Sequence, residues 1–207
     1  MQMTTTEDTT ALASICARVP GWSDAKQFRF FRRVFANHPE ISDVLMLGVY
    51  HGRDICIMRD VLDRYHAGRY VRIVGVDRFS AERCADWPTW AKSWGQLTRG
   101  MPPPNKDAAQ ANIASDTVQL VQAGDTDFLD LCNERFDFVY VDTSHDYASV
   151  RAVLTRLKPV CRPRAVVSGD DFSDDIGWGV ARAVNETFTH HVLHDDWIWE
   201  TTPEDFK

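Results

Sequence analysis

Short apolar runs alternate with amphipathic stretches along most of the chain. Most of the apolar runs are followed by a segment with helical periodicity, and they are rich in Val, Ile or aromatic residues, as buried strands are. The five runs cover residues 43–47, 71–76, 118–121, 136–141 and 165–168. Strands that alternate with helices predict an α/β fold with a doubly wound, mostly parallel sheet and helices on both faces.

The two ends of the chain extend this pattern. Ser23 is a candidate N-cap for a helix over 24–36, where Phe28, Phe31 and Phe35 fall on one face and indicate either core packing or an oligomer contact. A further helix is expected around 180–188. The tail at 190–201 alternates imperfectly and predicts two more strands, which an antiparallel hairpin at the sheet edge would accommodate. The expected sheet then has seven strands.

The longest insertion, residues 82–115, lies between the second and third strands. It carries Trp87, Trp90 and Trp94 at helical spacing, followed by the chain breaker at 101–104. Aromatic stripes usually mark buried faces, so we expect the tryptophans to pack this helical insert onto the body, with a lid as the alternative. With residues 1–40 as an N-terminal helical segment, the whole chain 1–207 is expected to form a single domain.

The composition and charge of the chain limit the classes of partner that we expect. The 207 residues carry a formal charge of −7, which leaves no broad basic field for phosphate contacts, so we expect no nucleic-acid partner. The N-terminus lacks a basic start followed by an apolar stretch, and no run of about 18 apolar residues occurs. We therefore expect a soluble, cytoplasmic protein with no membrane partner that acts on a small molecule, and homo-oligomer formation is left open.

A glycine-containing turn follows the first strand. Gly48, Val49, Tyr50 and Gly52 lie where the chain passes from this strand into the helical pattern at 55–65. At the carboxyl edge of a doubly wound sheet, such glycines let a ligand approach backbone N–H groups. The G-x-x-x-G spacing differs from the G-x-G-x-x-G of dinucleotide sites, which disfavours an NAD-dependent oxidoreductase.

The next two strands also end in polar residues. The second ends at Asp77, followed by Arg78, and a carboxylate there can accept hydrogen bonds from a ribose diol. The third ends before Gly124 and Asp125, which are placed to border an adenine. These positions predict a nucleoside-containing cofactor along this edge.

The fourth strand and its continuation read Phe136-Asp137-Phe138-Val139-Tyr140-Val141-Asp142-Thr143-Ser144-His145-Asp146-Tyr147. This segment and the order of strand-end motifs resemble the sequences of class I S-adenosylmethionine-dependent methyltransferases, in particular the methyltransferase 24 family of small-molecule O-methyltransferases. The resemblance covers roughly residues 41–175. The sequence departs from the family pattern at Thr143, which stands for the usual Gly, at Met46, where an acid that supports the cofactor is common, and at Arg164. The resemblance implies a Rossmann-like fold and S-adenosylmethionine held by Gly48, Val49, Tyr50, Gly52, Asp77, Arg78, Gly124, Asp125 and Asp142.

Acidic residues also end the fourth and fifth strands. Asp142, Asp170 and Asp171 can meet at one rim, and carboxylate oxygens are the ligands that Mg²⁺ prefers. His145 is a candidate general base, since imidazole titrates near neutral pH. The leading hypothesis is methyl transfer to an oxygen of a small polar metabolite, with Asp142 and His145 as catalytic residues and a divalent cation that favours ionisation of the acceptor.

Two other interpretations of these residues stay open. The acids can instead cap the next helix or face water, in which case the protein methylates oxygen or nitrogen without a metal. The departures at Met46 and Thr143 also leave room for a non-catalytic module that binds S-adenosylmethionine.

Overall fold

The computed structural model describes residues 5–82, 93–175 and 178–207. Its centre is a seven-stranded sheet with the order β3-β2-β1-β4-β5-β7-β6. The first five strands in the chain run parallel, β7 is antiparallel to β5, and β6 is antiparallel to β7. The strands are β1 Asp43–Leu47, β2 Arg72–Asp77, β3 Val118–Gln122, β4 Phe136–Val141, β5 Cys161–Gly169, β6 Val192–His194 and β7 Ile198–Thr201. The predicted sheet, including the hairpin at its edge, is confirmed.

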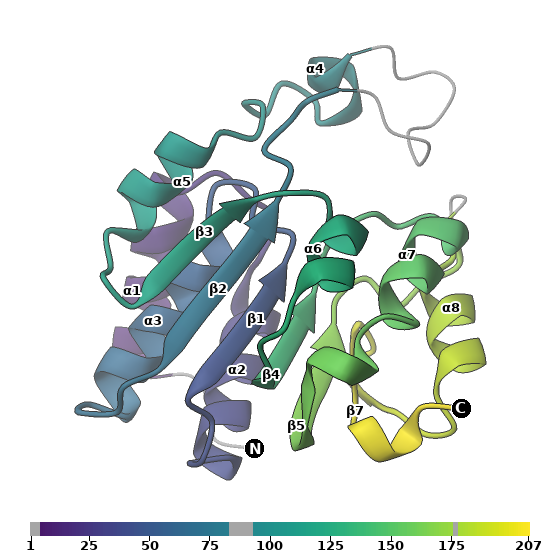
Figure 1. Cartoon of the computed structure of the whole chain (residues 1–207). Coiled ribbons are helices and arrows are strands. Elements are labelled where there is room, and N and C mark those ends of the chain that lie inside the picture. The colour runs from purple at the N-terminus through teal and green to yellow at the C-terminus, as the bar shows by residue number, and fades with distance from the viewer. Residues whose placement is uncertain (1–4, 83–92, 176–177) are drawn as a thin grey trace.

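Helices cover both faces of the sheet, so the fold has three layers (Figure 1). One face carries α1 Thr6–Arg18, α2 Ala25–Asn37, α3 Arg53–Tyr65 and α5 Lys106–Ile113. The other carries α6 Asp125–Leu131, α7 Tyr147–Leu154 and α8 Val180–Thr187. The short helix α4, Trp94–Leu97, lies beyond the carboxyl ends of the strands, and the 3₁₀ turns η1 Lys158–Val160 and η3 Pro203–Asp205 complete the described elements.

Alternation along the strands divides the core in two. In β1, Met46 packs toward the layer of α2 and α3, whereas Leu45 and Leu47 pack toward the layer of α7 and α8. The predicted aromatic stripe of α2 belongs to the first core, because Phe28, Phe31 and Phe35 are fully buried there. The stripe is therefore core packing and not an oligomer contact.

The start of α2 corrects one expectation. Its N-cap is Asp24, not Ser23, and the Asp24 carboxylate accepts a hydrogen bond from the backbone N–H of Lys26. Gln27 completes the capping box through the N–H of Asp24. Ser23 is buried and donates instead to the carboxylate of Asp54 on α3, at 2.7 Å. The hydroxyl thus serves a tertiary contact that the local sequence pattern does not indicate.

The insert at 82–115 is described in part. Trp87 and Trp90 lie outside the described residues, while Trp94 begins α4. The indole N–H of Trp94 donates to the carbonyls of Met101 and Pro102, and the ring stacks on Tyr50 with centroids 5.8 Å apart. The end of the insert, α5, packs against α3 and β3. The described part of the insert therefore packs onto the body, and a lid function stays a prediction.

Two charged side chains fasten the N-terminal helix. Asp8 of α1 is fully buried, and its carboxylate accepts hydrogen bonds from the hydroxyl of Tyr65, the backbone N–H of Thr5 and the guanidinium of Arg64. Burial raises the pKa of Asp8, but these hydrogen bonds lower it by more, to about 2. Arg53 of α3 donates to the carbonyls of Cys16, Val19 and Ser23. Together they hold α1 and the α1–α2 connection on α3.

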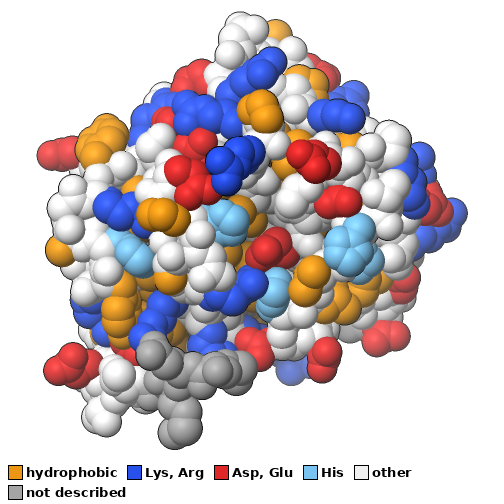
Figure 2. Space-filling view, turned by 90° about the horizontal axis from the view of Figure 1, so that it is seen from below, with side chains coloured by type: hydrophobic (Ala, Val, Ile, Leu, Met, Phe, Trp, Pro, Cys, Tyr) orange, Lys and Arg blue, Asp and Glu red, His pale blue; other side chains and the backbone are white. Residues whose placement is uncertain are grey.

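Ion pairs connect neighbouring strands at the amino edge of the sheet. Arg72 binds Asp43 at 2.8 Å, and Arg162 binds Asp43 at 3.0 Å and Asp137 at 2.7 Å. Viewed from this side, acidic and basic side chains are interspersed and form no extended patch of one sign (Figure 2). None of the helices in the described ranges combines the length and apolar character needed to cross a membrane. The opposite, carboxyl edge is where the candidate site lies.

Candidate functional site

The glycine turn after β1 lies directly against the end of β4. Gly48 has φ +87°, and a Cβ at this position would fall 1.7 Å from the carbonyl oxygen of Asp142. Strands β1 and β4 are neighbours in the sheet. The strands that follow β1 are added on one side of this pair, and β5 follows β4 on the other side. Doubly wound sheets bind their ligands at such a switch point. Only glycine allows this approach, so Gly48 brings the turn and Asp142 together.

Asp77, at the end of β2, organises the same turn. Its Oδ2 accepts the backbone N–H groups of Val49 and Tyr50, both at 2.8 Å, and its Oδ1 accepts the N–H of Phe79 at 2.6 Å. A carboxylate offers about four acceptor positions, so roughly one remains for a ligand. The sequence reasoning missed this structural role of Asp77, and binding of a ribose stays a prediction.

The end of β3 adjoins the end of β4 through Asp125. Burial raises the pKa of Asp125 to about 6, while a hydrogen bond with Thr143 opposes the rise and the charge of Asp77 adds to it. Thr143, one of the departures from the family pattern, therefore has a partner across the site. Close by, a hollow of about 240 Å³ is lined by Phe79, Gln122 and residues 104–107, which lead into α5.

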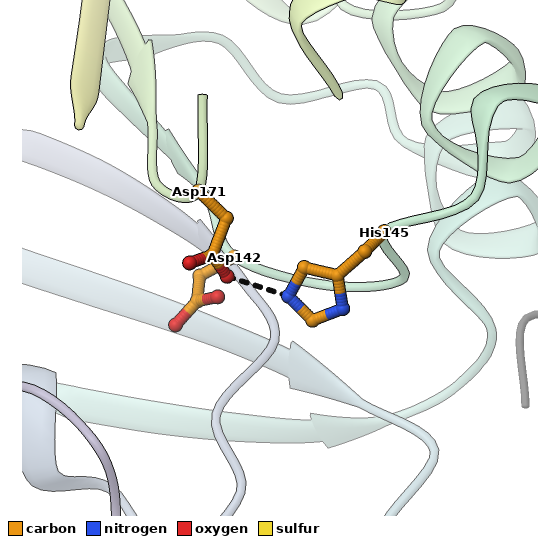
Figure 3. A group of neighbouring side chains, drawn as sticks. All are labelled: Asp142, His145 and Asp171. Carbon is orange, nitrogen blue, oxygen red and sulfur yellow. Dashed lines mark hydrogen bonds and ion pairs between the residues drawn. The ribbon is translucent and has the colours of Figure 1, made fainter. Parts of the chain in front are cut away.

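Asp142, His145 and Asp171 form the tightest group of potential ligands among the described residues. One ligand atom from each lies within 4.8 Å of the others. Nε2 of His145 is 2.5 Å from Oδ2 of Asp171, and the carboxylate of Asp142 lies beside this pair (Figure 3). The crevice at this group has a volume of about 10 Å³, which is the space of one water molecule or a small ion.

Asp170 lies apart from that group, although the sequence predicts it as a third metal ligand. Its Oδ2 accepts the amide of Gln27 at 2.6 Å, and its Oδ1 accepts the backbone N–H of Asp171 at 3.0 Å. Asp171 itself has φ +58°, a left-handed conformation that turns the two neighbouring carboxylates in different directions. His145 takes the place in the group that was expected for Asp170.

The carboxyl groups at this rim influence each other. Burial, followed by the charges of Asp170 and Asp171, raises the pKa of Asp142 well above its usual range. Burial and the charge of Asp171 likewise raise the pKa of Asp170 to about 6, against the opposing effect of Gln27. Positive charge placed among these groups would relieve the repulsion.

Aromatic rings surround the rim. Trp178 stacks on the His145 imidazole with centroids 4.5 Å apart, and Trp197 follows at 6.1 Å from Trp178. At the glycine turn, Tyr50 contacts Trp22, which is 60% exposed, with ring centroids 5.1 Å apart. Flat apolar surfaces therefore border the polar groups from two directions.

The predicted site residues converge as the parallel sheet requires. The glycine turn, Asp77, Asp125 and Asp142 meet at the carboxyl edge, and His145 and Asp171 adjoin them. Gly52 and Gly124 are the N-caps of α3 and α6, and Arg78, which follows β2, is exposed. The sequence reasoning missed Gln27, Ser23 and Asp54, which approach the rim from the N-terminal segment and α3. The one available signal was an acid, Asp54, at the start of an otherwise apolar helix face.

Comparisons with known proteins identify the family and agree with the fold. Residues 45–172 match the model of a family described as a methyltransferase domain. A search of curated protein sequences finds no match. The fold is similar to the O-methyltransferase NovP, with 17% identity and a TM-score of 0.68 over 93% of this chain and 95% of that one.

Two further solved structures are similar over most of their length. CalS11, a calicheamicin methyltransferase, is 15% identical with a TM-score of 0.63, covering 96% of this chain and 93% of that chain. Cofactor-bound Rv0187 from MTB is 19% identical with a TM-score of 0.62, covering 95% of this chain and 89% of that chain. At these identities the likeness concerns the fold.

Proposed function

The chain belongs to the methyltransferase-domain family of class I S-adenosylmethionine-dependent enzymes, and from this premise we propose that it methylates an oxygen of a small polar metabolite with the help of a divalent cation. The observation that carries the proposal is the convergence of Asp142, His145 and Asp171 beside the glycine turn. A cation-binding group and a candidate base next to the cofactor turn suit a hydroxyl acceptor.

The residues at the carboxyl edge fit S-adenosylmethionine. We assign the ribose to the remaining acceptor position of Asp77 and the adenine to the hollow beside Phe79 and Gln122. The bound cofactor supplies a methyl group on a positively charged sulfur, which an oxygen nucleophile can attack. Gly48 and Asp142, in contact at the switch point, then border the place where donor and acceptor meet.

The donor set at the rim fits a hard divalent cation. Asp142 and Asp171 supply carboxylate oxygens, which both Mg²⁺ and Mn²⁺ prefer. A cation there would favour ionisation of an acceptor hydroxyl. We assign acceptance of the hydroxyl proton to the imidazole of His145, which is bonded to Asp171 through Nε2 (Figure 3), and assign Asp142 and Asp171 alone as protein ligands of the cation.

The acceptor is proposed to be a small ring compound. The rings of Trp178 and Trp197 continue from His145 and offer flat surfaces to a sugar or phenol. Support for a sugar also comes from the similar structure of CalS11, described as a TDP-rhamnose 3'-O-methyltransferase, which is 15% identical with a TM-score of 0.57.

The first test is calorimetric titration with S-adenosylhomocysteine, followed by transfer of a labelled methyl group from S-adenosylmethionine to TDP-rhamnose and to catechol, with Mg²⁺ or with EDTA. We expect micromolar binding and label transfer that EDTA suppresses. Absence of binding under every condition would overturn the function, and transfer that is indifferent to EDTA would remove the cation.

A second test separates the base from the cation site. Mn²⁺ binding is followed by electron paramagnetic resonance in Asp171→Asn, in His145→Ala and in a control, Asp175→Asn, which removes an exposed acid nearby. We expect at least tenfold weaker Mn²⁺ binding in the first variant and no change in the control. His145→Ala is expected to suppress methyl transfer while preserving the affinity for S-adenosylhomocysteine, and unchanged transfer would refute its role as base.

A further inference from the structure

Lys26, in the first turn of α2, lies at the border of the candidate site. The next residue, Gln27, donates to the carboxylate of Asp170 at 2.6 Å, which fixes the start of α2 against the end of β5. The charge of Lys26 reaches the same carboxyl group. Burial raises the pKa of Asp170 to about 6, and Lys26 is among the groups that oppose the rise.

The turn between β6 and β7 lies against the same part of α2. Arg29 binds Asp195 in this turn through Nη2, at 2.9 Å. Two residues further, the ring centre of Trp197 lies 5.1 Å from Nζ of Lys26, within the range of a cation–π contact. The carbonyl of Trp197 also accepts the backbone N–H of Phe172 at 2.9 Å, which joins the turn to the segment that follows β5. Lys26 and Trp197 therefore meet where α2, the hairpin and the end of β5 come together.

Aromatic rings connect Lys26 with the candidate base. Trp178 is stacked on His145 with centroids 4.5 Å apart, and its ring centre lies 6.1 Å from that of Trp197. Trp197 in turn contacts Lys26. An imidazole, two indole rings and an ammonium group thus form a continuous row from the candidate cation group to α2. An acceptor whose hydroxyl lies at His145 and whose ring lies along the indoles would reach Lys26 with its far end.

The ammonium group of Lys26 is available to a ligand. Its side chain is 33% exposed, and in the part of the chain that the structure describes Nζ has no hydrogen-bond acceptor. The Oδ2 atom of Asp24 lies 3.9 Å away, which is too far for a hydrogen bond, while Oδ1 accepts the backbone N–H of Lys26 as the helix cap. Because an ammonium group has three donors and an exposed ion pair of this kind adds little stability, an anion of a ligand can bind there.

The neighbouring charges decide where an anion can lie. The carboxyl groups of Asp142 and Asp171 lie at the other end of the row, where they attract a cation and repel an anion. Arg29, the next cation along α2, is paired with Asp195. Lys26 therefore offers an anion-binding position at the α2 end of the row, with two indole rings between it and the acids.

We propose that the methyl acceptor carries an anionic group and that Lys26 binds this group while the acceptor hydroxyl lies at His145. The inference rests on the proposed function and names the acceptor class, a hydroxylated ring compound with an acidic substituent. A charged hydrogen bond to Lys26 favours such a compound over a neutral one of the same shape. Lys26 is thus a specificity-determining residue, which contributes to binding of the acceptor and not to transfer of the methyl group.

The test uses pairs of acceptors that differ in charge and share their ring and hydroxyl groups. Protocatechuate and its methyl ester form one pair, and dihydrocaffeate and its methyl ester form a second, in which the carboxylate lies further from the hydroxyl groups. Calorimetry measures their binding to the protein loaded with S-adenosylhomocysteine and Mg²⁺. In the wild type we expect at least one acid to bind about tenfold or more tightly than its ester. In Lys26→Gln we expect that acid and its ester to bind about equally.

Two control variants separate the charge of Lys26 from its packing. Lys26→Arg keeps the positive charge and is expected to retain the preference for the acid. Lys158→Gln removes another lysine that lies over an aromatic ring, with Nζ 5.8 Å from the ring centre of Phe206, but at the amino edge of the sheet. It is expected to leave every affinity unchanged. Lys26→Gln should also retain the wild-type affinity for S-adenosylhomocysteine and for both esters.

Three results would overturn the inference while the proposed function stands. They are equal binding of both acids and their esters to the wild type, no binding of any of the four compounds, and a preference for the acid that persists in folded Lys26→Gln. A wild-type protein that fails to bind S-adenosylhomocysteine would instead overturn the proposed function itself.

Discussion

Replacement of Gly48 by Ala tests how the glycine turn and β4 create the site. Gly48 has φ +87°, and the added Cβ would lie 1.7 Å from the carbonyl oxygen of Asp142. Gly68 has the same φ of +87° but no atom within 4 Å of its added Cβ, and it lies in an exposed turn. The two substitutions therefore carry the same left-handed backbone cost and differ in the steric contact.

The expected magnitudes follow from that difference. The left-handed conformation costs an alanine about 1–2 kcal/mol, which is the full effect expected for Gly68→Ala. Non-bonded C···O contacts are about 3.3 Å or longer, so the ends of β1 and β4 would have to separate by roughly 1.5 Å in Gly48→Ala. Overpacking of this kind adds about 1–3 kcal/mol, for a total of about 2–5 kcal/mol.

Urea unfolding and calorimetry with S-adenosylhomocysteine measure the two consequences. We expect Gly48→Ala to lose clearly more unfolding free energy than Gly68→Ala and to bind the ligand at least tenfold more weakly, because the turn moves away from Asp142. Gly68→Ala is expected to retain the wild-type affinity. Equal stability losses and equal affinities in the two variants would refute the argument that contact with Asp142 requires glycine at position 48.

Three further substitutions test the packing of α1 and the support of the turn. Asp8→Asn is expected to lower the free energy of unfolding by about 2 kcal/mol at pH 7. Because the pKa of Asp8 in the folded state, about 2, lies below the ordinary 3.8, the stabilisation by this carboxylate is complete above about pH 4 and disappears as the pH falls through 2. Urea titrations from pH 6 to pH 2 should therefore show the difference between wild type and variant narrowing, and a constant difference would contradict the assignment. Arg53→Lys cannot reach all three carbonyls and is expected to cost about 1–2 kcal/mol and to speed amide exchange along α1; unchanged exchange would argue against this anchor. Asp77→Asn leaves one acceptor oxygen for three backbone N–H groups, so we expect at least tenfold weaker S-adenosylhomocysteine binding. Wild-type affinity in this variant would exclude both the support of the glycine turn and the proposed ribose contact as contributions of Asp77 to binding.

The local sequence pattern was sufficient to predict the strands and the edge of the sheet at which the candidate site lies. The predicted first and fourth strands coincide with β1 and β4, and the other strand predictions shift or extend by a few residues at their ends. This succeeds because a buried strand needs a nearly continuous apolar run, and parallel strands bring their carboxyl ends to one edge. Gly48, Asp77 and Asp142 could therefore be placed at this edge, as candidate site residues, from their positions after strands.

Hydrogen-bond partners were decided by the tertiary structure. Asp77 accepts backbone N–H groups of a turn 27 to 28 residues away, and Asp170 pairs with Gln27 across 143 residues of sequence. A carboxylate at a strand end has the same local pattern whether it faces a ligand, a cation or a neighbouring helix, so periodicity cannot distinguish these cases.

The same limit applies to Asp54 and to the metal group. An acid in the first turn of a helix is usually a favourable, solvated residue, and only the packing of the α1–α2 connection onto α3 buries it. The left-handed backbone at Asp171 turns its carboxylate to His145 and leaves Asp170 to Gln27. The sequence by itself determined which strands end in acids, and the tertiary structure decided which of those acids share a partner, because that depends on elements far apart in the chain.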